Sequence, residues 1–385
     1  MAKKSFRLSI TIFILASILT SVFYKGADWI LEKTKKPFNL ELVYTFEHEN
    51  TTNVVRPFKN NIVIYEDNYI KVYTKEGQII CNILAEYKKP FILTSNNLFF
   101  TGDKETGYIS AKDEKGNIVW DYEVKEKIKY ITNDSTGNIA LITESENKSN
   151  ILVLNEQGKV KGRFSINKSS VVDMALSEGG EKVGLSILEI GSSMKSSTAL
   201  YWAKGGLIGG QTYNDEIIPN IFFTEDDTLI SIGDKNVAAF HKSGPLWKRP
   251  IDGTLKRVAF NKNGQIALNI TREKKAIIDT KRQNFILVLD KDNNEQVISG
   301  VNGKVIDMDF IDENLFFCTD RTLFFVQRDT INKNKLTGNK TIDQNELKEK
   351  KINNDIKFIK KLDNTYILLG LKDKTKVYGI KYEPN

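Results

Sequence analysis

Residues 131–143 read ITNDSTGNIALIT: an apolar strand, a polar turn rich in Asn, Asp and Gly, and a second apolar strand. With Gly137 as its reference, the same phrase returns seven more times along the chain, at Asn61, Asn97, Gly180, Asp227, Gly264, Asn314 and Asn364. Successive returns lie 36 to 50 residues apart. A period of this length with several short strands per unit is typical of the blades of a β-propeller. The pattern therefore predicts an all-β fold built from repeated antiparallel sheets.

Each repeat supplies four candidate strands, which are clearest at residues 128–132, 138–143, 150–155 and 159–166. A second tight turn precedes the fourth strand, and it carries Gly or Asn where the chain needs a left-handed residue to reverse. These residues are Gly77, Gly116, Gly158, Gly244 and Asn293. The fourth repeat departs from the pattern, with AKGGLIGG at residues 203–210.

The two ends of the repeat array predict how the ring closes. The last repeat has only three strands, at residues 356–361, 366–371 and 376–382, and Leu40–Glu47 (LELVYTFE) supplies a fourth. Pairing these segments removes two open sheet edges. We therefore expect an eight-bladed propeller over residues 39–384, closed by its N- and C-terminal strands. Seven blades is the alternative if one repeat is not a true blade.

A polar segment at residues 330–354 interrupts the seventh repeat. It is either a solvated loop or a peripheral strand with a mobile flap, and its composition favours disorder over a functional role.

The N-terminal residues predict a membrane anchor. Residues 8–24 (LSITIFILASILTSVFY) contain no charge and, as a helix, reach about 26 Å. A cleaved signal peptide is the alternative, but no pair of small residues marks a cleavage site. We expect residues 1–7 to be a cytoplasmic tail, 8–24 a transmembrane anchor and 25–38 a stalk. Basic residues lie at both ends of the anchor, so both orientations stay open, and the N-terminal ones favour a propeller outside the cell membrane.

Charge and cysteine content argue against a nucleic-acid-binding surface and a zinc site. The net charge is +7, but residues 1–36 contribute +5 of it, so the remainder is close to neutral. A nucleic-acid-binding surface needs a dense basic stripe, and none is visible. Cys81 and Cys318 lie in strand patterns without zinc-ligand spacing and indicate two inert thiols. The DKDNNE stretch at residues 290–295 has alternating oxygen ligands, but it fits a hairpin turn better than a calcium loop.

One stretch carries a family resemblance. Residues 111–120 (AKDEKGNIVW) place Ala111, Asp113, Gly116 and Trp120 in the order of the blade motif of quinoprotein-dehydrogenase-like propellers. The domain thus resembles PQQ-type and WD40-like propellers, and it is similar to membrane-anchored propeller proteins of unassigned function in Firmicutes. The resemblance implies structural roles only: Asp113 and Gly116 shape a turn, and Trp120 docks between neighbouring blades.

No catalytic, cofactor or metal site emerges from the sequence. The calcium-binding set of the quinoprotein enzymes cannot be placed on this chain, and no nucleotide-binding or nucleophile motif is present. We therefore expect a non-catalytic scaffold, without a cofactor, that binds a protein or a cell-envelope component and no nucleic acid.

Two alternatives remain open. One is a hydrolase or lyase acting on envelope polysaccharide, with carboxylates in the central funnel; Asp173, Asp307 and Asp309 are the candidates. The other is a sensor that signals through the helix, although a tail of about seven residues is short for that role.

Overall fold

The computed structural model describes residues 39–47, 54–145, 148–167, 170–242, 244–275, 280–311, 313–327, 331, 341–342 and 347–381. The chain divides into two units: residues 40–380 form one, and residues 1–39 with 381–385 form the other. The predicted tail, anchor and stalk lie outside the described residues. Within the described ranges, no helix is both long enough and apolar enough to cross a membrane.

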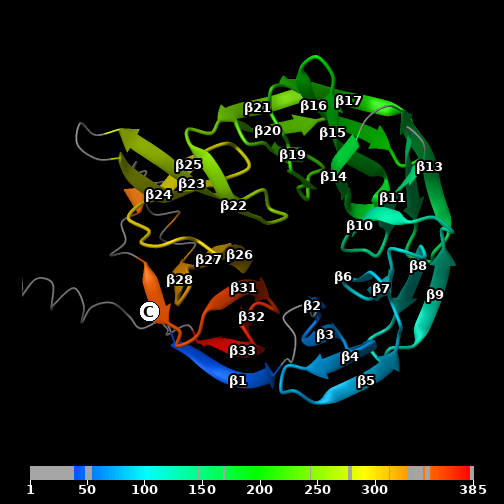
Figure 1. Cartoon of the computed structure of the whole chain (residues 1–385), viewed down its shortest axis with the longest axis horizontal. Helices are drawn as coiled ribbons and strands as arrows, with labels where there is room; N and C mark the ends of the chain where they lie inside the picture. Colours follow the sequence, from blue (N-terminus) through cyan, green and yellow to red (C-terminus); the bar gives the residue numbers. More distant parts are fainter. Residues whose placement is uncertain are drawn as a thin grey trace, which may run out of the picture. The chain divides into compact units, whose positions relative to one another are not determined.

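Residues 40–380 form eight sheets, built mainly from antiparallel strands, that are arranged around a common centre (Figure 1). Blades one and two comprise β2 (Val54–Phe58), β3 (Asn61–Glu66), β4 (Tyr69–Thr74), β5 (Ile79–Leu84), β6 (Pro90–Thr94), β7 (Phe99–Asp103), β8 (Tyr108–Lys112) and β9 (Ile118–Glu123). Blades three and four comprise β10 (Ile128–Asn133), β11 (Ile139–Ser145), β12 (Lys148–Leu154), β13 (Val160–Asn167), β14 (Ser170–Leu176), β15 (Lys182–Ile190), β16 (Met194–Trp202) and β17 (Leu207–Asn214).

The second half of the ring repeats this plan. Blades five and six comprise β18 (Asn220–Phe223), β19 (Leu229–Ile232), β20 (Asn236–His241), β21 (Gly244–Pro250), β22 (Thr254–Phe260), β23 (Ile266–Lys275), β24 (Thr280–Leu289) and β25 (Glu295–Ile298). Blades seven and eight comprise β26 (Asp307–Ile311), β27 (Asn314–Cys318), β28 (Thr322–Val326), β30 (Lys348–Lys351), β31 (Ile356–Lys361), β32 (Tyr366–Leu371), β33 (Lys374–Lys381) and β1 (Asn39–Glu47). The prediction of eight blades is confirmed.

Ring closure follows the sequence-based prediction. In the eighth sheet the strand order is β1-β33-β32-β31, so the first strand of the domain completes the last blade. The side chain of Lys374 in β33 reaches Glu47 of β1 at 3.4 Å. Phe46 of β1 is buried and packs edge-on against Tyr73 of blade one, with ring centroids 5.0 Å apart. The closing strand therefore contacts both blades that it joins.

The polar segment at residues 330–354 contributes strands where the structure describes it. Thr341–Ile342 forms β29, which pairs in parallel with β25 and adds a fifth strand to blade six. Lys348–Lys351 forms β30, the outer strand of blade seven. These parts of the segment are thus peripheral strands, the second of the two forms expected from the sequence. The fourth repeat is also a regular blade, since Gly205 and Gly206 adopt positive φ in its tight turn.

The hydrophobic core lies between neighbouring blades. For example, Ile142 and Ile151 of blade three belong to the same buried cluster as Met174 and Leu185 of blade four. The second strands are buried along most of their length, whereas the outer strands alternate between exposed and partly buried residues. Each blade therefore buries its apolar surface only by stacking on its neighbours, as repeat architectures require.

Candidate binding pocket along the inner strands

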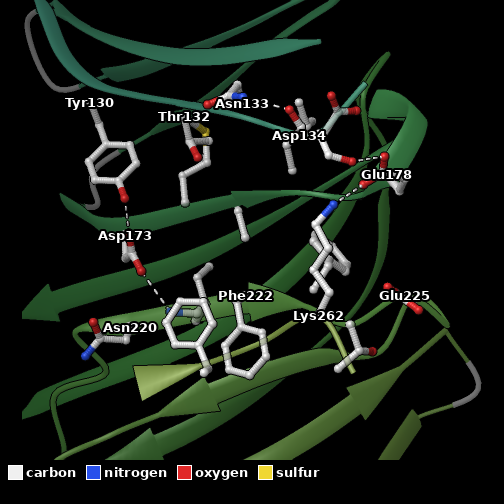
Figure 2. Close-up of a pocket in the computed structure, with 18 residues that line it drawn as sticks. Tyr130, Thr132, Asn133, Asp134, Asp173, Glu178, Asn220, Phe222, Glu225 and Lys262 are labelled. Carbon is white, nitrogen blue, oxygen red and sulfur yellow. Dashed lines mark hydrogen bonds and ion pairs between the residues drawn. The ribbon is translucent and has the colours of Figure 1, made fainter. Parts of the chain in front are cut away.

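A pocket of about 360 Å³ runs along the first strands of four consecutive blades, three to six (Figure 2). We call it the inner-strand pocket. The residues that line it come from β10, β14, β18, β22 and the turns that follow these strands: Tyr130, Thr132–Ser135, Asp173–Leu176, Glu178, Asn220–Glu225, Phe260 and Lys262. These turns belong to the recurring phrase. The pocket therefore brings together turn residues whose identity differs from one blade to the next.

Two phenylalanine rings form the most apolar part of the inner-strand pocket. Phe222 of β18 and Phe260 of β22 stack with centroids 4.0 Å apart and planes 8° from parallel. Phe222 is buried, but Phe260 is 41% exposed. An exposed ring at the surface of a concave site offers an apolar contact to a ligand or partner.

An ion pair crosses the pocket. Glu178 begins the short 3₁₀ helix η1 (Glu178–Gly180) in blade four, and its Oε2 lies 3.1 Å from Nζ of Lys262 in blade six. The Ser135 hydroxyl donates to the other carboxylate oxygen of Glu178. Burial opposes ionisation of Glu178, but the hydrogen bond from Ser135 and the ion pair with Lys262 outweigh it and lower the pKa of the carboxyl. Glu178 is therefore an anion of blade four that is bound by Ser135 of blade three and Lys262 of blade six.

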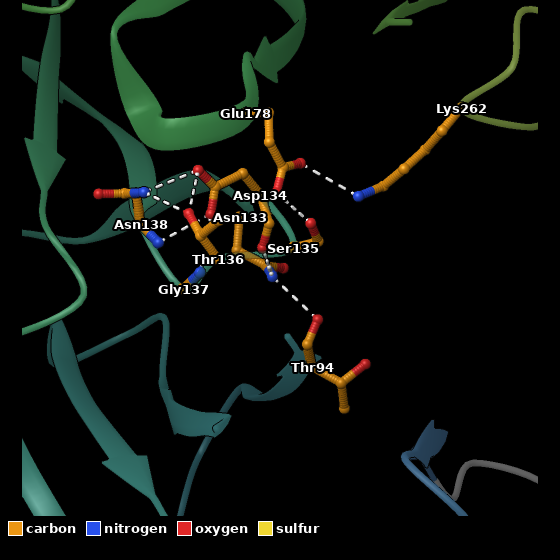
Figure 3. Close-up of polar contacts among 9 residues, drawn as sticks. All are labelled: Thr94, Asn133, Asp134, Ser135, Thr136, Gly137, Asn138, Glu178 and Lys262. Atoms are coloured by element: carbon orange, nitrogen blue, oxygen red, sulfur yellow. Dashed lines mark hydrogen bonds and ion pairs between the residues drawn. The ribbon is translucent and has the colours of Figure 1, made fainter. Parts of the chain in front are cut away.

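The turn at residues 134–138 is organised by Asp134 (Figure 3). Its Oδ1 accepts hydrogen bonds from the backbone N–H of Gly137 at 2.8 Å and of Asn138 at 2.9 Å. Its Oδ2 accepts from Asn138 Nδ2 at 2.7 Å. Asn133, just before it, donates to the carbonyl of Thr94 in blade two at 2.9 Å. The acid of this turn shapes the backbone, and it has little capacity left for a ligand.

Asp173 is at the other end of the pocket, and it joins three blades. It accepts a hydrogen bond from the hydroxyl of Tyr130 in blade three at 2.5 Å and one from the backbone N–H of Ile221 in blade five at 2.8 Å. Burial raises the pKa of the Asp173 carboxyl, although these hydrogen bonds favour its ionised form.

Asp307 and Asp309 form the same kind of bridge between blades seven and eight. Asp307 Oδ2 accepts from the backbone N–H of Ile359 at 3.1 Å, and Asp309 Oδ2 accepts from that of Lys361 at 3.0 Å. Burial raises the pKa of Asp309, and the nearby charge of Lys360 acts in the opposite direction.

The three acids predicted from the sequence therefore do not come together. Asp173 lines the inner-strand pocket, whereas Asp307 and Asp309 lie on β26 in blade seven (Figure 1). All three accept a backbone N–H from the next blade, which explains their presence on inner strands without any catalysis. Among the described residues, no group of three or more His, Cys, Asp or Glu side chains is arranged to hold a metal ion.

The motif residues lie at an interface between blades. Asp113 Oδ1 accepts from the N–H groups of Lys115 and Asn117, both at 2.9 Å, in the turn where Gly116 has φ 86°. Trp120 Nε1 donates to the carbonyl of Glu156 in blade three at 2.8 Å. Ala111 is fully buried. Trp247 makes the same kind of contact, since its Nε1 donates to the carbonyl of Lys291 in blade six at 3.0 Å.

Glu178, Phe260 and Lys262 were not among the residues predicted from the sequence. Each lies within or next to a repeat of the recurring phrase, at a position that differs from blade to blade. Turn residues that only shape the backbone tend to be Gly, Asn or Asp. A different residue type at one of these turn positions was therefore the sequence feature that could have indicated a binding role.

Comparisons with solved structures agree with the fold. The chain is similar to the C-terminal WD40 domain of Sif2, with a TM-score of 0.63 at 12% identity over 90% of this chain and 100% of that one. It is similar to the Dos1 propeller, with a TM-score of 0.58 at 10% identity over 88% and 95% of the two chains. It is also similar to BamB from Moraxella catarrhalis, with a TM-score of 0.55 at 11% identity over 89% and 100%. At these identities the likeness shows the fold alone, a WD40- and BamB-like propeller.

No curated protein matches the sequence. One family model does, over residues 33–353, which is most of the chain. The chain therefore belongs to the family of unknown function DUF5711.

Proposed function

We propose that this protein is a non-catalytic scaffold, anchored in the cell membrane with its propeller outside, that binds a protein partner or a cell-envelope component through the inner-strand pocket. The observation that carries the proposal is the exposed ring of Phe260 in a concave site whose buried acid, Asp173, is bonded to the protein itself. The apolar stretch at residues 8–24 supports the anchor.

A cross-linking experiment on the full-length chain in its native membranes tests the binding role. We expect a specific set of cross-linked proteins or envelope polymers with the wild-type chain, and its loss in Phe260→Ser. Ile118→Ser is the matched control, because Ile118 is a 59% exposed apolar side chain on the outer strand β9, away from the pocket. Thermal unfolding of both variants verifies that they fold. Equal recovery from Phe260→Ser and the wild type would exclude the pocket as the binding site.

Cysteine labelling tests the location. Ser192 is exposed in the turn between β15 and β16, so Ser192→Cys in a Cys81→Ser background presents an accessible thiol, while Cys318 is buried. A membrane-impermeant maleimide should label this variant in intact cells. Labelling only after lysis would place the propeller on the cytoplasmic side.

A further inference from the structure

We infer that the partner enters the inner-strand pocket with a Lys or Arg side chain, and that Lys262 holds the position which this cation takes. The inference rests on the proposed function, since it names the chemistry of the partner. It follows from three observations on the pocket: its charge, its exposed ring and the ion pair that crosses it.

The charge of the inner-strand pocket selects against an anionic occupant. Its lining contains four carboxylates, Asp134, Asp173, Glu178 and Glu225, and one cation, Lys262. The oxygens of Asp134 and Asp173 accept hydrogen bonds from the protein, as described above. Glu178 and the exposed Glu225 are therefore the acids that are placed to meet a partner. A cation is the charge that complements them.

The exposed ring of Phe260 also favours a basic side chain. Phe260 lies two residues before Lys262, and its far face is covered by the stacked ring of Phe222. A cation is attracted to the open face of an aromatic ring, by about 0.5–1 kcal/mol at exposed sites. The aliphatic stem of Lys or Arg also covers apolar surface while its charged end remains in a polar setting. The inference requires one basic side chain to contact Phe260 and Glu178 together, and both residues line the same pocket.

The Glu178–Lys262 ion pair is weak enough for a second cation to replace Lys262. It joins blade four to blade six, and the turn of blade five also contacts Lys262, since the Glu225 N–H donates to the Lys262 carbonyl at 2.9 Å. The two side chains are 44% and 53% exposed. Exposed pairs of this kind contribute only about 0–1 kcal/mol, so a second cation that gains the ring contact as well can displace Lys262. The carboxylate then keeps its bond from Ser135 and changes only its cationic partner.

The experiment uses the full-length chain in detergent and two fluorescently labelled nonapeptides of Gly and Ser that differ at three central positions, Arg-Trp-Arg in one and Glu-Trp-Glu in the other. Fluorescence anisotropy measures their affinities. We expect the Arg peptide to bind more tightly than the Glu peptide. Lys262→Met should tighten binding of the Arg peptide about two- to fivefold, because it removes the internal competitor. Glu178→Gln should weaken it by a similar factor or more.

Asp227→Asn is the matched control. It breaks a different ion pair, Lys182–Asp227 at 2.6 Å between blades four and five, which is not part of the pocket lining, and it should leave both affinities unchanged. Opposite signs for Lys262→Met and Glu178→Gln are the signature of displacement, since a structural role of the pair would give both variants the same effect.

Several results would overturn the inference: preference for the Glu peptide, weaker Arg-peptide binding by Lys262→Met, or no binding of either peptide by the wild type and Lys262→Met. Its failure differs from failure of the proposed function. If cross-linked partners are lost in Phe260→Ser but are recovered equally with Glu178→Gln and Lys262→Met, the pocket binds a partner of another chemistry. If Phe260→Ser recovers them all, the proposed site itself is wrong.

Discussion

At the scale of single residues, Lys112 is a basic side chain buried among neutral hydrogen-bond partners. It ends β8 at 3% exposure, and its Nζ donates to two neutral groups, Thr101 Oγ1 at 2.9 Å and Ser110 Oγ at 2.7 Å. Burial lowers its pKa to about 8, against a weaker opposing effect of Cys81 and Asp121. Because the charged form loses more by burial than the neutral form, Lys112 destabilises the fold at neutral pH.

The low pKa of Lys112 predicts a pH dependence of stability with a definite sign. The unfolded chain keeps this proton up to its ordinary pKa of 10.5, whereas the folded chain releases it near 8. Between these values the unfolded state binds more protons, so the free energy of unfolding should rise with pH in the wild type relative to Lys112→Met. The full difference is at most about 3 kcal/mol.

Urea unfolding of both proteins at intervals from pH 7 to pH 10 measures this difference. Lys115→Met, which alters an exposed lysine three residues away, is the control and should follow the wild type. A difference between the wild type and Lys112→Met that stays constant over this range would show that Lys112 is charged in the folded state as well.

At the scale of elements, the contacts between blades rely on a side chain of one outer strand and the tight turn of the next blade. Trp120 of β9 lies against Gly158 in the turn of blade three, so closely that a Cβ there would be 2.6 Å from the indole ring. Trp247 of β21 meets the turn of blade six in the same way, through its bond to Lys291. The indole supplies both apolar contact and a hydrogen bond to a carbonyl that the turn leaves open.

Replacing either tryptophan by Phe should separate these two contributions. Trp120→Phe and Trp247→Phe keep an aromatic ring but lose the bonds to Glu156 and Lys291, and each should lower the free energy of unfolding by about 1 kcal/mol. Trp202→Phe is the control, because Trp202 is 47% exposed and should have a smaller effect. Urea midpoints measure all three. Equal effects at the three positions would assign the loss to the ring alone.

The sequence predicts elements well and sites between elements poorly, for a physical reason. Strands and turns depend on neighbouring residues, so the phrase around Gly137 and the turn at Gly116 are visible directly. The inner-strand pocket depends on which strands and turns meet across four blades. Glu178 and Lys262 are 84 residues apart, and nothing in either local pattern indicates the other. Asp173 was found as an acid on an inner strand, but its bonds to Tyr130 and Ile221 arise only when the blades pack.

At the scale of the whole molecule, the ring of residues 40–380 depends on one pairing between distant parts of the sequence. Tyr44 of β1 lies against Gly77 in the tight turn of blade one, where a Cβ would be 2.2 Å from the phenol ring. This is the contact of Trp120 with Gly158 repeated at the point of closure. Because neighbouring blades share their cores, opening at this point exposes apolar surface on blades one and eight together.

Gly77→Ala should therefore weaken the closure of the ring. Gly77 has φ 85°, so the variant combines backbone strain with a clash against Tyr44. Gly179→Ala isolates the strain, since Gly179 has φ 75° and no atom within 4 Å of an added Cβ. Backbone strain at such positions costs about 1 kcal/mol, so Gly179→Ala should lose about that much stability and Gly77→Ala clearly more.

Native-state hydrogen exchange should show the extra loss of protection first in β1, β33 and β2. Tyr44→Ala combined with Gly77→Ala removes the clash, and it should be less destabilising than the sum of the two single changes. If Gly77→Ala and Gly179→Ala lose the same stability and exchange alike, then the Tyr44 contact does not hold the ring closed, and closure depends on the β1–β33 pairing alone.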